Sequence, residues 1–129
     1  MQAYDLDGTL ADVNFEQARF KSMAAIFTDA PVIYQPQQPF VVITGRPHGT
    51  DAEKRATAAW LRENQPNFGA IYYVDGSQAD QIAGKVRILK RLNITDFTDN
   101  NTDVLAAVRK EIPNIRLWQM NQQGKRTSY

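Results

Sequence analysis

Short apolar segments of strand length alternate with segments of helical periodicity along the whole chain. Residues 40–43 form the continuous apolar run Phe-Val-Val-Ile, which is typical of a strand covered on both faces. Residues 1–4, 70–74, 94–98 and 115–120 are the other strand candidates. Because parallel strands are joined by right-handed crossovers through helices, this alternation predicts an α/β fold. We expect a single-domain, three-layer α/β sandwich with an open five-stranded parallel sheet.

The helices are predicted from capping residues and from apolar residues at helical spacing. Thr50 and Glu53 have the spacing of a capping box, which predicts a helix that begins there and ends near Asn64. Residues 79–92 and 102–112 show the same periodicity. Residues 14–27 predict a further helix, with Phe15, Ala18, Met23, Ile26 and Phe27 buried.

Prolines and polar residues mark the irregular parts of the chain. Residues 29–39 contain Pro31, Pro36 and Pro39 and are expected to lack regular structure. Residues 122–129 are polar, and we expect a frayed tail there. The predicted domain therefore spans residues 1–121, followed by a polar C-terminal tail at 122–129.

Composition excludes several classes of protein. Hydrophobic residues make up 43% and charged residues 22%, which is typical of a folded domain. The net charge of +1 gives no general argument for a polyanionic partner. The chain has no cysteine and a single histidine, His48, so a thiol nucleophile, a cysteine zinc site and a multi-histidine metal site are excluded. No apolar run approaches the length of a membrane span, and the start lacks the pattern of a signal peptide; the expected location is cytoplasmic.

Two acids one residue apart follow the first predicted strand. Asp5 and Asp7 share one face of an extended chain, and Gly8-Thr9 comes directly after them. Carboxylates together with the backbone N–H groups of a loop suit a divalent cation and a phosphate held side by side. An acidic turn is the plainer interpretation of the same residues.

Polar residues also follow the other predicted strands, and parallel sheets place their sites beyond these strand ends. Asp5 is the candidate nucleophile, and Asp7 is the candidate general acid and base. Thr44, with the Gly45 N–H beside it, is a candidate phosphate ligand, and Lys85 can neutralise the phosphoryl group. Asp99 completes an all-oxygen cation site with Asp5 and the backbone carbonyl of Asp7, a donor set that favours Mg²⁺ over zinc.

Some of these assignments have rivals nearby in the sequence. Arg87, Lys90 and Arg91 lie on the same predicted helix as Lys85, and a solvated basic face would explain all of these cations. Asp96 is the rival of Asp99. Arg46 and His48 lie beside the predicted site, where Arg46 is a candidate for contact with the substrate.

In these motifs the chain resembles the haloacid-dehalogenase (HAD) superfamily of phosphotransferases. Residues 5–10, Asp-Leu-Asp-Gly-Thr-Leu, match the first motif, and residues 41–46, Val-Val-Ile-Thr-Gly-Arg, match the second. Lys85 corresponds to the third motif, and residues 97–100 with Asp103 correspond to the fourth. The resemblance implies an HAD-like Rossmann-type fold. It also implies a catalytic set of Asp5, Asp7, Thr44 and Lys85, substrate-binding Gly45 and Arg46, and metal ligands Asp5, Asp7 and Asp99.

Within that superfamily, the chain is similar to the 3′-phosphatase domain of phage-type polynucleotide kinases. No kinase P-loop is present, so the resemblance is to the phosphatase half alone. That relative usually shows two adjacent acids in the fourth motif, whereas this chain has Asp99-Asn100. The intervals between the motifs leave no room for a cap domain, which implies an open site suited to large substrates.

These observations predict a Mg²⁺-dependent phosphomonoester hydrolase that forms an aspartyl phosphate. The expected partner is a phosphorylated substrate, with nucleotides and nucleic-acid 3′-phosphate ends favoured. No association with a membrane is expected. Asn100 and the missing cap motivate the alternative of a catalytically weak HAD-fold module that binds a protein or nucleic acid. Transfer of the phosphoryl group to an acceptor other than water is a third option.

Overall fold

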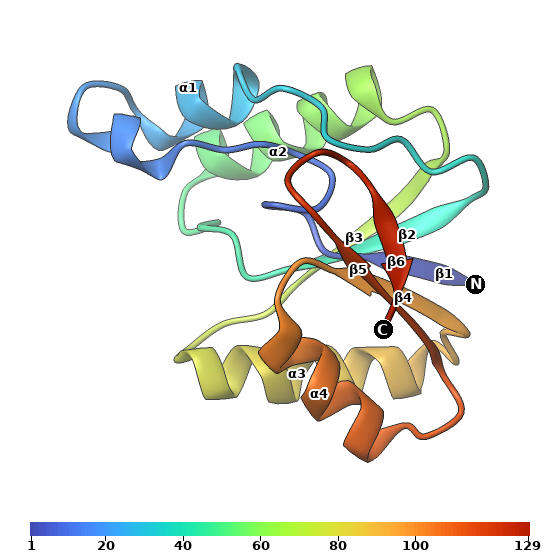
Figure 1. The fold of residues 1–129 in the computed structure, drawn as a ribbon. Helices are drawn as coiled ribbons and strands as arrows, with labels where there is room; N and C mark the ends of the chain where they lie inside the picture. The colour runs from blue at the N-terminus through green and yellow to red at the C-terminus, as the bar shows by residue number, and fades with distance from the viewer.

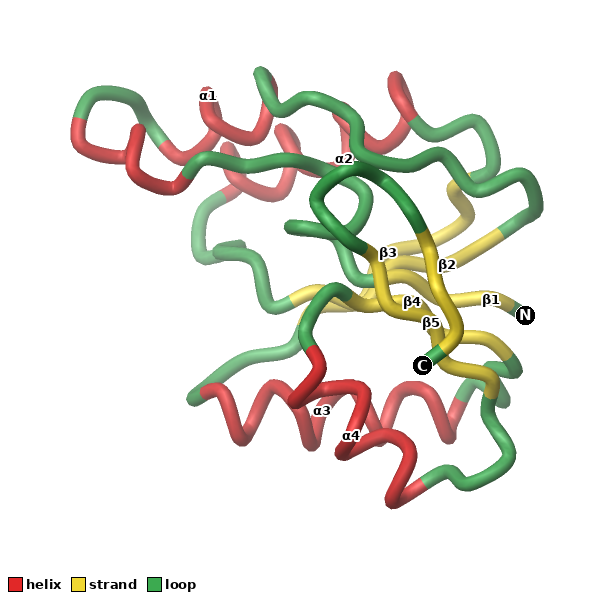
Figure 2. Tube along the Cα trace, viewed as in Figure 1, coloured by secondary structure: helices red, strands yellow, loops and turns green.

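The computed structural model describes residues 1–129 as one α/β unit in three layers. In Figures 1 and 2, η1 (Phe15–Arg19), α1 (Met23–Thr28) and α2 (Asp51–Asn64) lie over one face of the sheet. The helices α3 (Gln78–Arg91) and α4 (Thr102–Glu111) lie over the other face. None of these helices combines the length and the apolar character that crossing a bilayer requires.

The sheet has six strands in the order β3-β2-β1-β4-β5-β6. Its parallel strands are β1 (Gln2–Tyr4), β2 (Phe40–Thr44), β3 (Phe68–Tyr73), β4 (Asp96–Asp99) and β5 (Arg116–Met120). β1 lies between β2 and β4, with Ala3 opposite Val41 on one side and Phe97 on the other. β2 and β3 follow each other on one side of β1, and the next strands, β4 and β5, lie on its other side. The strand order therefore switches direction at β1.

The sixth strand corrects the predicted sheet. β6 (Arg126–Ser128) pairs antiparallel with β5, with Arg126 opposite Met120, in the segment that the sequence predicted to be a frayed tail. Three polar residues carry no strand periodicity of their own. They pair because the turn before them returns the chain along β5. Gly124 adopts a φ of +78° in that turn.

The segment between β1 and α1 also differs from the prediction. A single helix over residues 14–27 was expected, but a 3₁₀ helix ends at Arg19 and α1 begins only after Ser22, whose side chain caps it. Phe15 is exposed rather than buried, and so is Ala18. Ile26 and Phe27 are buried as predicted.

Alternating residues of the strands build a separate core on each face of the sheet. Val41 and Ile43 pack with the α3 and α4 layer, where Leu89 and Leu105 are fully or almost fully buried. Phe40 and Val42 point to the opposite face and pack with residues that include Trp60 of α2. These two cores fix the positions of the loops that follow β1, β2 and β4.

The helix starts agree with the predicted caps. Thr50 accepts a hydrogen bond from the Glu53 N–H, and the Glu53 carboxylate accepts one from the Thr50 N–H, which completes the capping box of α2. Ser77 and Asp80 form the same reciprocal pair at the start of α3. α3 therefore has a defined start, which places Lys85 two turns along its buried face.

Candidate active site

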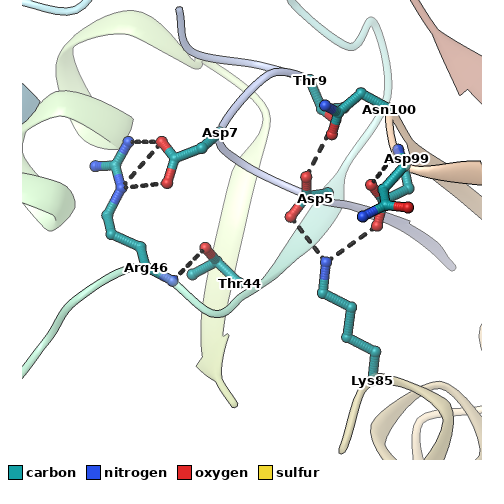
Figure 3. Close-up of polar contacts among 9 residues, drawn as sticks. Asp5, Asp7, Thr9, Thr44, Arg46, Lys85, Asp99 and Asn100 are labelled. Atoms are coloured by element: carbon teal, nitrogen blue, oxygen red, sulfur yellow. Dashed lines mark hydrogen bonds and ion pairs between the residues drawn. The ribbon is translucent and has the colours of Figure 1, made fainter. Parts of the chain in front are cut away.

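Four predicted residues meet at the carboxyl ends of β1 and β4. Asp5 and Asp7 follow β1, Asp99 ends β4, and Lys85 reaches the same point from α3 (Figure 3). All four line a cavity of about 230 Å³, together with Asn100 and other residues of α3 and α4. The switch in strand order beside β1 opens this cavity, as expected for an open parallel sheet.

Lys85 joins two of the buried acids. Its Nζ donates to Asp5 Oδ1 at 2.9 Å and to Asp99 Oδ2 at 3.0 Å. Burial favours the neutral amine, but the facing carboxylates of Asp5 and Asp99 outweigh this effect and raise the pKa of Lys85. Burial and the neighbouring Asp5 charge raise the pKa of Asp99 to about 7. The lysine is therefore a fixed positive charge beside two carboxylates that would otherwise repel each other.

The other oxygens of these acids converge on the side chain of Asn100. In the orientation that satisfies its amide, Nδ2 donates to Asp5 Oδ2 at 3.0 Å, Asp99 Oδ1 at 3.2 Å and the carbonyl oxygen of Asp7 at 3.3 Å. Thr9 Oγ1 lies 3.2 Å from the same nitrogen. One partially positive amide group therefore sits where four oxygen atoms meet.

Gly8 gives Asn100 the space for this position. Its φ of +79° is one that L side chains rarely adopt. A Cβ at this residue would also lie 2.5 Å from the other end of the Asn100 amide, which is Oδ1 in this orientation. A side chain at position 8 would therefore both strain the loop and displace the amide.

Asp7 faces a different partner. The Nε of Arg46 donates to both carboxylate oxygens of Asp7, at 3.2 and 3.1 Å, and Nη2 donates to Oδ1 (Figure 3). The Arg46 side chain is fully buried: its guanidinium lies 4.0 Å from the Phe27 ring centroid and donates to Thr57 Oγ1. Burial raises the pKa of Asp7, against the opposing effect of Arg46. Arg46 thus positions the Asp7 carboxylate.

The last residue of β2 and the residues directly after it lie beside the cavity without lining it. Thr44 is buried, and its hydroxyl accepts a hydrogen bond from the Arg46 N–H at 3.0 Å. A Cβ at Gly45 would lie 1.9 Å from the side-chain oxygen of Gln81, which does line the cavity. The His48 ring stacks on Tyr73 with 4.2 Å between ring centroids, and His48 Nε2 lies 2.8 Å from Asp75 Oδ1. Thr44, Gly45 and Arg46 therefore stay predictions as phosphate or substrate ligands.

The rivals of Lys85 and Asp99 point elsewhere. Lys90 is exposed and pairs with Glu111 at 3.7 Å, while Arg87 and Arg91 are exposed on the outer face of α3. Asp96 begins β4, at the opposite end of the strand from the cavity, and accepts a hydrogen bond from Thr95. Among these candidates, only Lys85 and Asp99 line the cavity.

The oxygen atoms available to a cation are few. No three carboxylate, histidine or cysteine side chains are spaced to hold a metal ion on their own. The donors that do meet are one oxygen each of Asp5 and Asp99 and the carbonyl oxygen of Asp7, all of which contact the Asn100 amide. A hard cation such as Mg²⁺ accepts such oxygens and commonly keeps several water ligands.

Sequence reasoning assigned no role to several residues that the structure places in contact with the site. Thr9 donates to Asp5 Oδ2 at 3.3 Å, and Thr57 and Phe27 hold the guanidinium of Arg46. Thr9 lies within the first motif, so its position was a usable signal. Thr57 and Phe27 come from separate helices, and nothing in the sequence links them to Arg46.

Comparison with known proteins supports the fold alone. No protein-family model matches the chain, and no curated protein matches its sequence. Among solved structures, a chain in the "Structure of the Pnkp1/Rnl/Hen1 RNA repair complex" is similar, with a TM-score of 0.67 and 15% sequence identity. The alignment covers 93% of the present chain and 42% of that chain. The present chain thus spans less than half the length of its structural neighbour.

Proposed function

We propose that this chain is an HAD-type, Mg²⁺-dependent phosphomonoester hydrolase that works through an aspartyl phosphate on Asp5. The observation that carries the proposal is the position of the Asp5 carboxylate. It lies in the cavity at the end of β1, held by Lys85 at 2.9 Å and by Thr9 at 3.3 Å. A nucleophile held in one orientation beside a fixed positive charge is what attack on a phosphoryl group requires.

The donor set fits a magnesium ion. Asp5 Oδ2, Asp99 Oδ1 and the carbonyl oxygen of Asp7 would hold it, since these atoms already converge on one amide group. When bound, Mg²⁺ supplies positive charge that stabilises the phosphoryl oxygens in the transition state. The Asn100 side chain must turn away from this point, and it has room to do so because it is exposed.

The protein's own groups account for both steps of the reaction. An Asp5 oxygen forms a bond to phosphorus, the ester P–O bond breaks, and Asp7 gives its proton to the leaving oxygen. Asp7 then takes a proton from water as that water attacks the phosphorus, which releases inorganic phosphate and restores Asp5. Burial of Asp7 raises its pKa, which favours the protonated form that the first step needs. Lys85 neutralises the transferring group in both steps.

Nucleotides and nucleic-acid 3′-phosphate ends are the proposed substrates. The site has no domain inserted over it, because the intervals between β1 and β2 and between β2 and β3 hold only helices and connecting loops. A large substrate can therefore reach Asp5. The likeness to a chain of an RNA repair complex supports the same substrate class.

Phosphate release from an aryl phosphate and from a 3′-phosphorylated oligonucleotide tests the proposal. We expect release with Mg²⁺, loss of release in excess chelator, and loss of activity in Asp5→Asn. Asp96→Asn is the matched control, since it removes an acid at the other end of β4. Undiminished activity in chelator or in Asp5→Asn would exclude this mechanism.

A second candidate function is a catalytically weak HAD-fold module that binds a protein or nucleic acid. It is favoured by the engagement of Asp7 with Arg46 and by the absence of a three-acid metal cluster. Mg²⁺ binding without turnover on a broad panel of phosphoesters would support this alternative.

A further inference from the structure

A second, larger groove adjoins the catalytic cavity. It measures about 760 Å³ and lies between the loop after β1, with Gly8 and Asp12, and the turn that joins β5 to β6. Figure 1 shows these two segments on the same side of the sheet. Asn100 lines both the groove and the catalytic cavity. A substrate with its phosphoryl group at Asp5 can therefore extend into the groove past Asn100.

The groove is lined mainly by side-chain amides. Five of its nine lining residues are Asn or Gln: Asn100, Gln119, Asn121, Gln122 and Gln123. Asp12 is the one charged residue in the lining, and no lysine or arginine contributes. Each amide offers a donor and an acceptor side by side, which matches the edges of nucleobases and the hydroxyls of a sugar. A groove without cations is poorly suited to further phosphates.

The turn presents these amides on a fixed backbone. Asn121 Oδ1 accepts from the N–H groups of Gln123 and Lys125, both at 2.9 Å, and the Asn121 N–H donates to the Lys125 carbonyl at 3.0 Å. Gly124 packs closely against the loop before β2: a Cβ at Gly124 would lie 2.6 Å from the carbonyl oxygen of Ile33. The backbone that carries Gln122 and Gln123 is thus ordered before any ligand arrives, which lowers the entropic cost of binding.

β5 and β6 form an antiparallel hairpin, and Arg126 at the start of β6 contacts β1 at the centre of the sheet. Arg126 Nη1 donates to the Tyr4 hydroxyl at 2.8 Å, and its guanidinium lies 4.4 Å from the Trp118 ring. These contacts hold the hairpin beside the loop after β1. Two independent anchors, one in the turn and one at its base, therefore shape the wall of the groove.

We propose that this groove binds the sugar and base of a nucleotide unit whose phosphoryl group lies at Asp5. The inference rests on the proposed function for the position of the phosphate. The amide lining and the absence of cations select a neutral, hydrogen-bonding group, which fits a nucleoside and excludes a second phosphate. In a polynucleotide end, the terminal nucleotide occupies the groove and the preceding phosphates lie outside it.

Equilibrium binding by calorimetry tests the inference apart from catalysis. The probes are a nucleoside 3′-monophosphate, a 3′-phosphorylated dinucleotide and glycerol phosphate, titrated into Asp5→Asn protein with Mg²⁺. We expect the nucleotide probes to bind at least about tenfold more tightly than glycerol phosphate. We expect Gln122→Ala/Gln123→Ala, made in the same background, to remove most of that difference. The control is Gln37→Ala/Gln38→Ala, which removes two exposed glutamines from the loop before β2 and should keep the full preference.

The two proposals fail in different ways. Equal affinity for glycerol phosphate and nucleotides, or an undiminished nucleotide preference in the Gln122/Gln123 variant, would overturn the groove assignment while leaving phosphatase activity intact. Absence of phosphate release by the wild-type protein from every substrate would overturn the proposed function. In that case the binding preference still decides the groove.

Discussion

Arg46 holds the carboxylate of Asp7 through two of its nitrogen atoms while its guanidinium stacks on Phe27. A planar group that donates twice and stacks at the same time cannot be replaced by the point charge of a lysine. The arrangement keeps the proposed acid–base residue in one orientation beside the cavity.

Arg46→Lys therefore reduces both turnover and stability. We expect kcat to fall at least about tenfold, and the free energy of unfolding to fall by about 3 kcal/mol, because a buried ion pair loses its geometry. Urea unfolding and steady-state kinetics provide the measurements. Arg55→Lys, on the exposed face of α2, is the control and should change neither value. Equal kcat in Arg46→Lys and wild type would show that the pair does not position Asp7.

Lys85→Gln removes the charge shared by Asp5 and Asp99. Since both carboxylates then face each other without a cation, we expect a lower melting temperature in chelator, and Mg²⁺ should recover part of the loss. Thermal melts with and without Mg²⁺ measure both effects. Lys90→Gln, on the same helix but exposed, should melt like the wild type. An identical loss in the two variants would show that the position of Lys85 in the site is unimportant for stability.

Asn100→Asp replaces the central amide with a carboxylate. Four oxygen atoms surround this position, so the metal-free variant should melt at a lower temperature than the wild type. A further acid beside the proposed cation site should tighten Mg²⁺ binding by on the order of tenfold, or about 1.4 kcal/mol. Calorimetric titration with Mg²⁺ measures the affinity, and Asn114→Asp at an exposed loop is the control. Weaker Mg²⁺ binding in Asn100→Asp would place the cation elsewhere.

Tyr4 makes stability sensitive to alkaline pH. Its buried phenol donates to Gln2 and accepts from Arg126, and burial raises its pKa to about 12. The unfolded chain releases this proton near pH 10, whereas the folded chain retains it to about pH 12. The stabilisation is therefore complete below pH 10 and is lost as the pH rises through 12.

Urea unfolding of Tyr4→Phe at pH 8 and pH 11 checks this dependence. The variant should lose about 1 kcal/mol at pH 8 through its missing hydrogen bonds. Because it cannot ionise at this position, it should show a smaller drop in stability than the wild type between the two pH values. A parallel drop in both proteins would assign the alkaline sensitivity to another group.

The five parallel strands, and the meeting of Asp5, Asp7, Lys85 and Asp99 beyond their ends, could be predicted from the sequence, whereas the order of the strands in the sheet was not predicted. Parallel strand ends converge whatever the details of packing, so a polar residue after a buried strand is enough to place it. The rigid crossovers also bring the inward face of α3 to the same edge. Lys85 lies on that inward face of α3, whereas Lys90 is exposed, and this difference distinguishes the two lysines as candidates for the site.

The remaining features depend on contacts between distant segments. The pairing of Arg46 with Asp7 needs a ring from α1 and a hydroxyl from α2, and no single stretch of sequence encodes that combination. Residues 126–128 pair only because a turn directs them onto β5, so their polar composition suggested a tail. Ser22 caps a new helix that begins at Met23, which interrupts a periodicity that looked continuous over residues 14–27.

The antiparallel direction of β6 returns the chain toward the end of the sheet where β1 begins, and Figure 1 shows the N- and C-terminal labels on the same side of the sheet. The cavity lined by Asp5, Lys85 and Asp99 opens at the other end of the parallel strands. A fluorescent protein, a surface-immobilisation tag or a tethered oligonucleotide carrier fused at either terminus would therefore be attached toward the end of the sheet away from the cavity. Single-molecule or surface-based measurements of substrate capture can thus use both termini as handles.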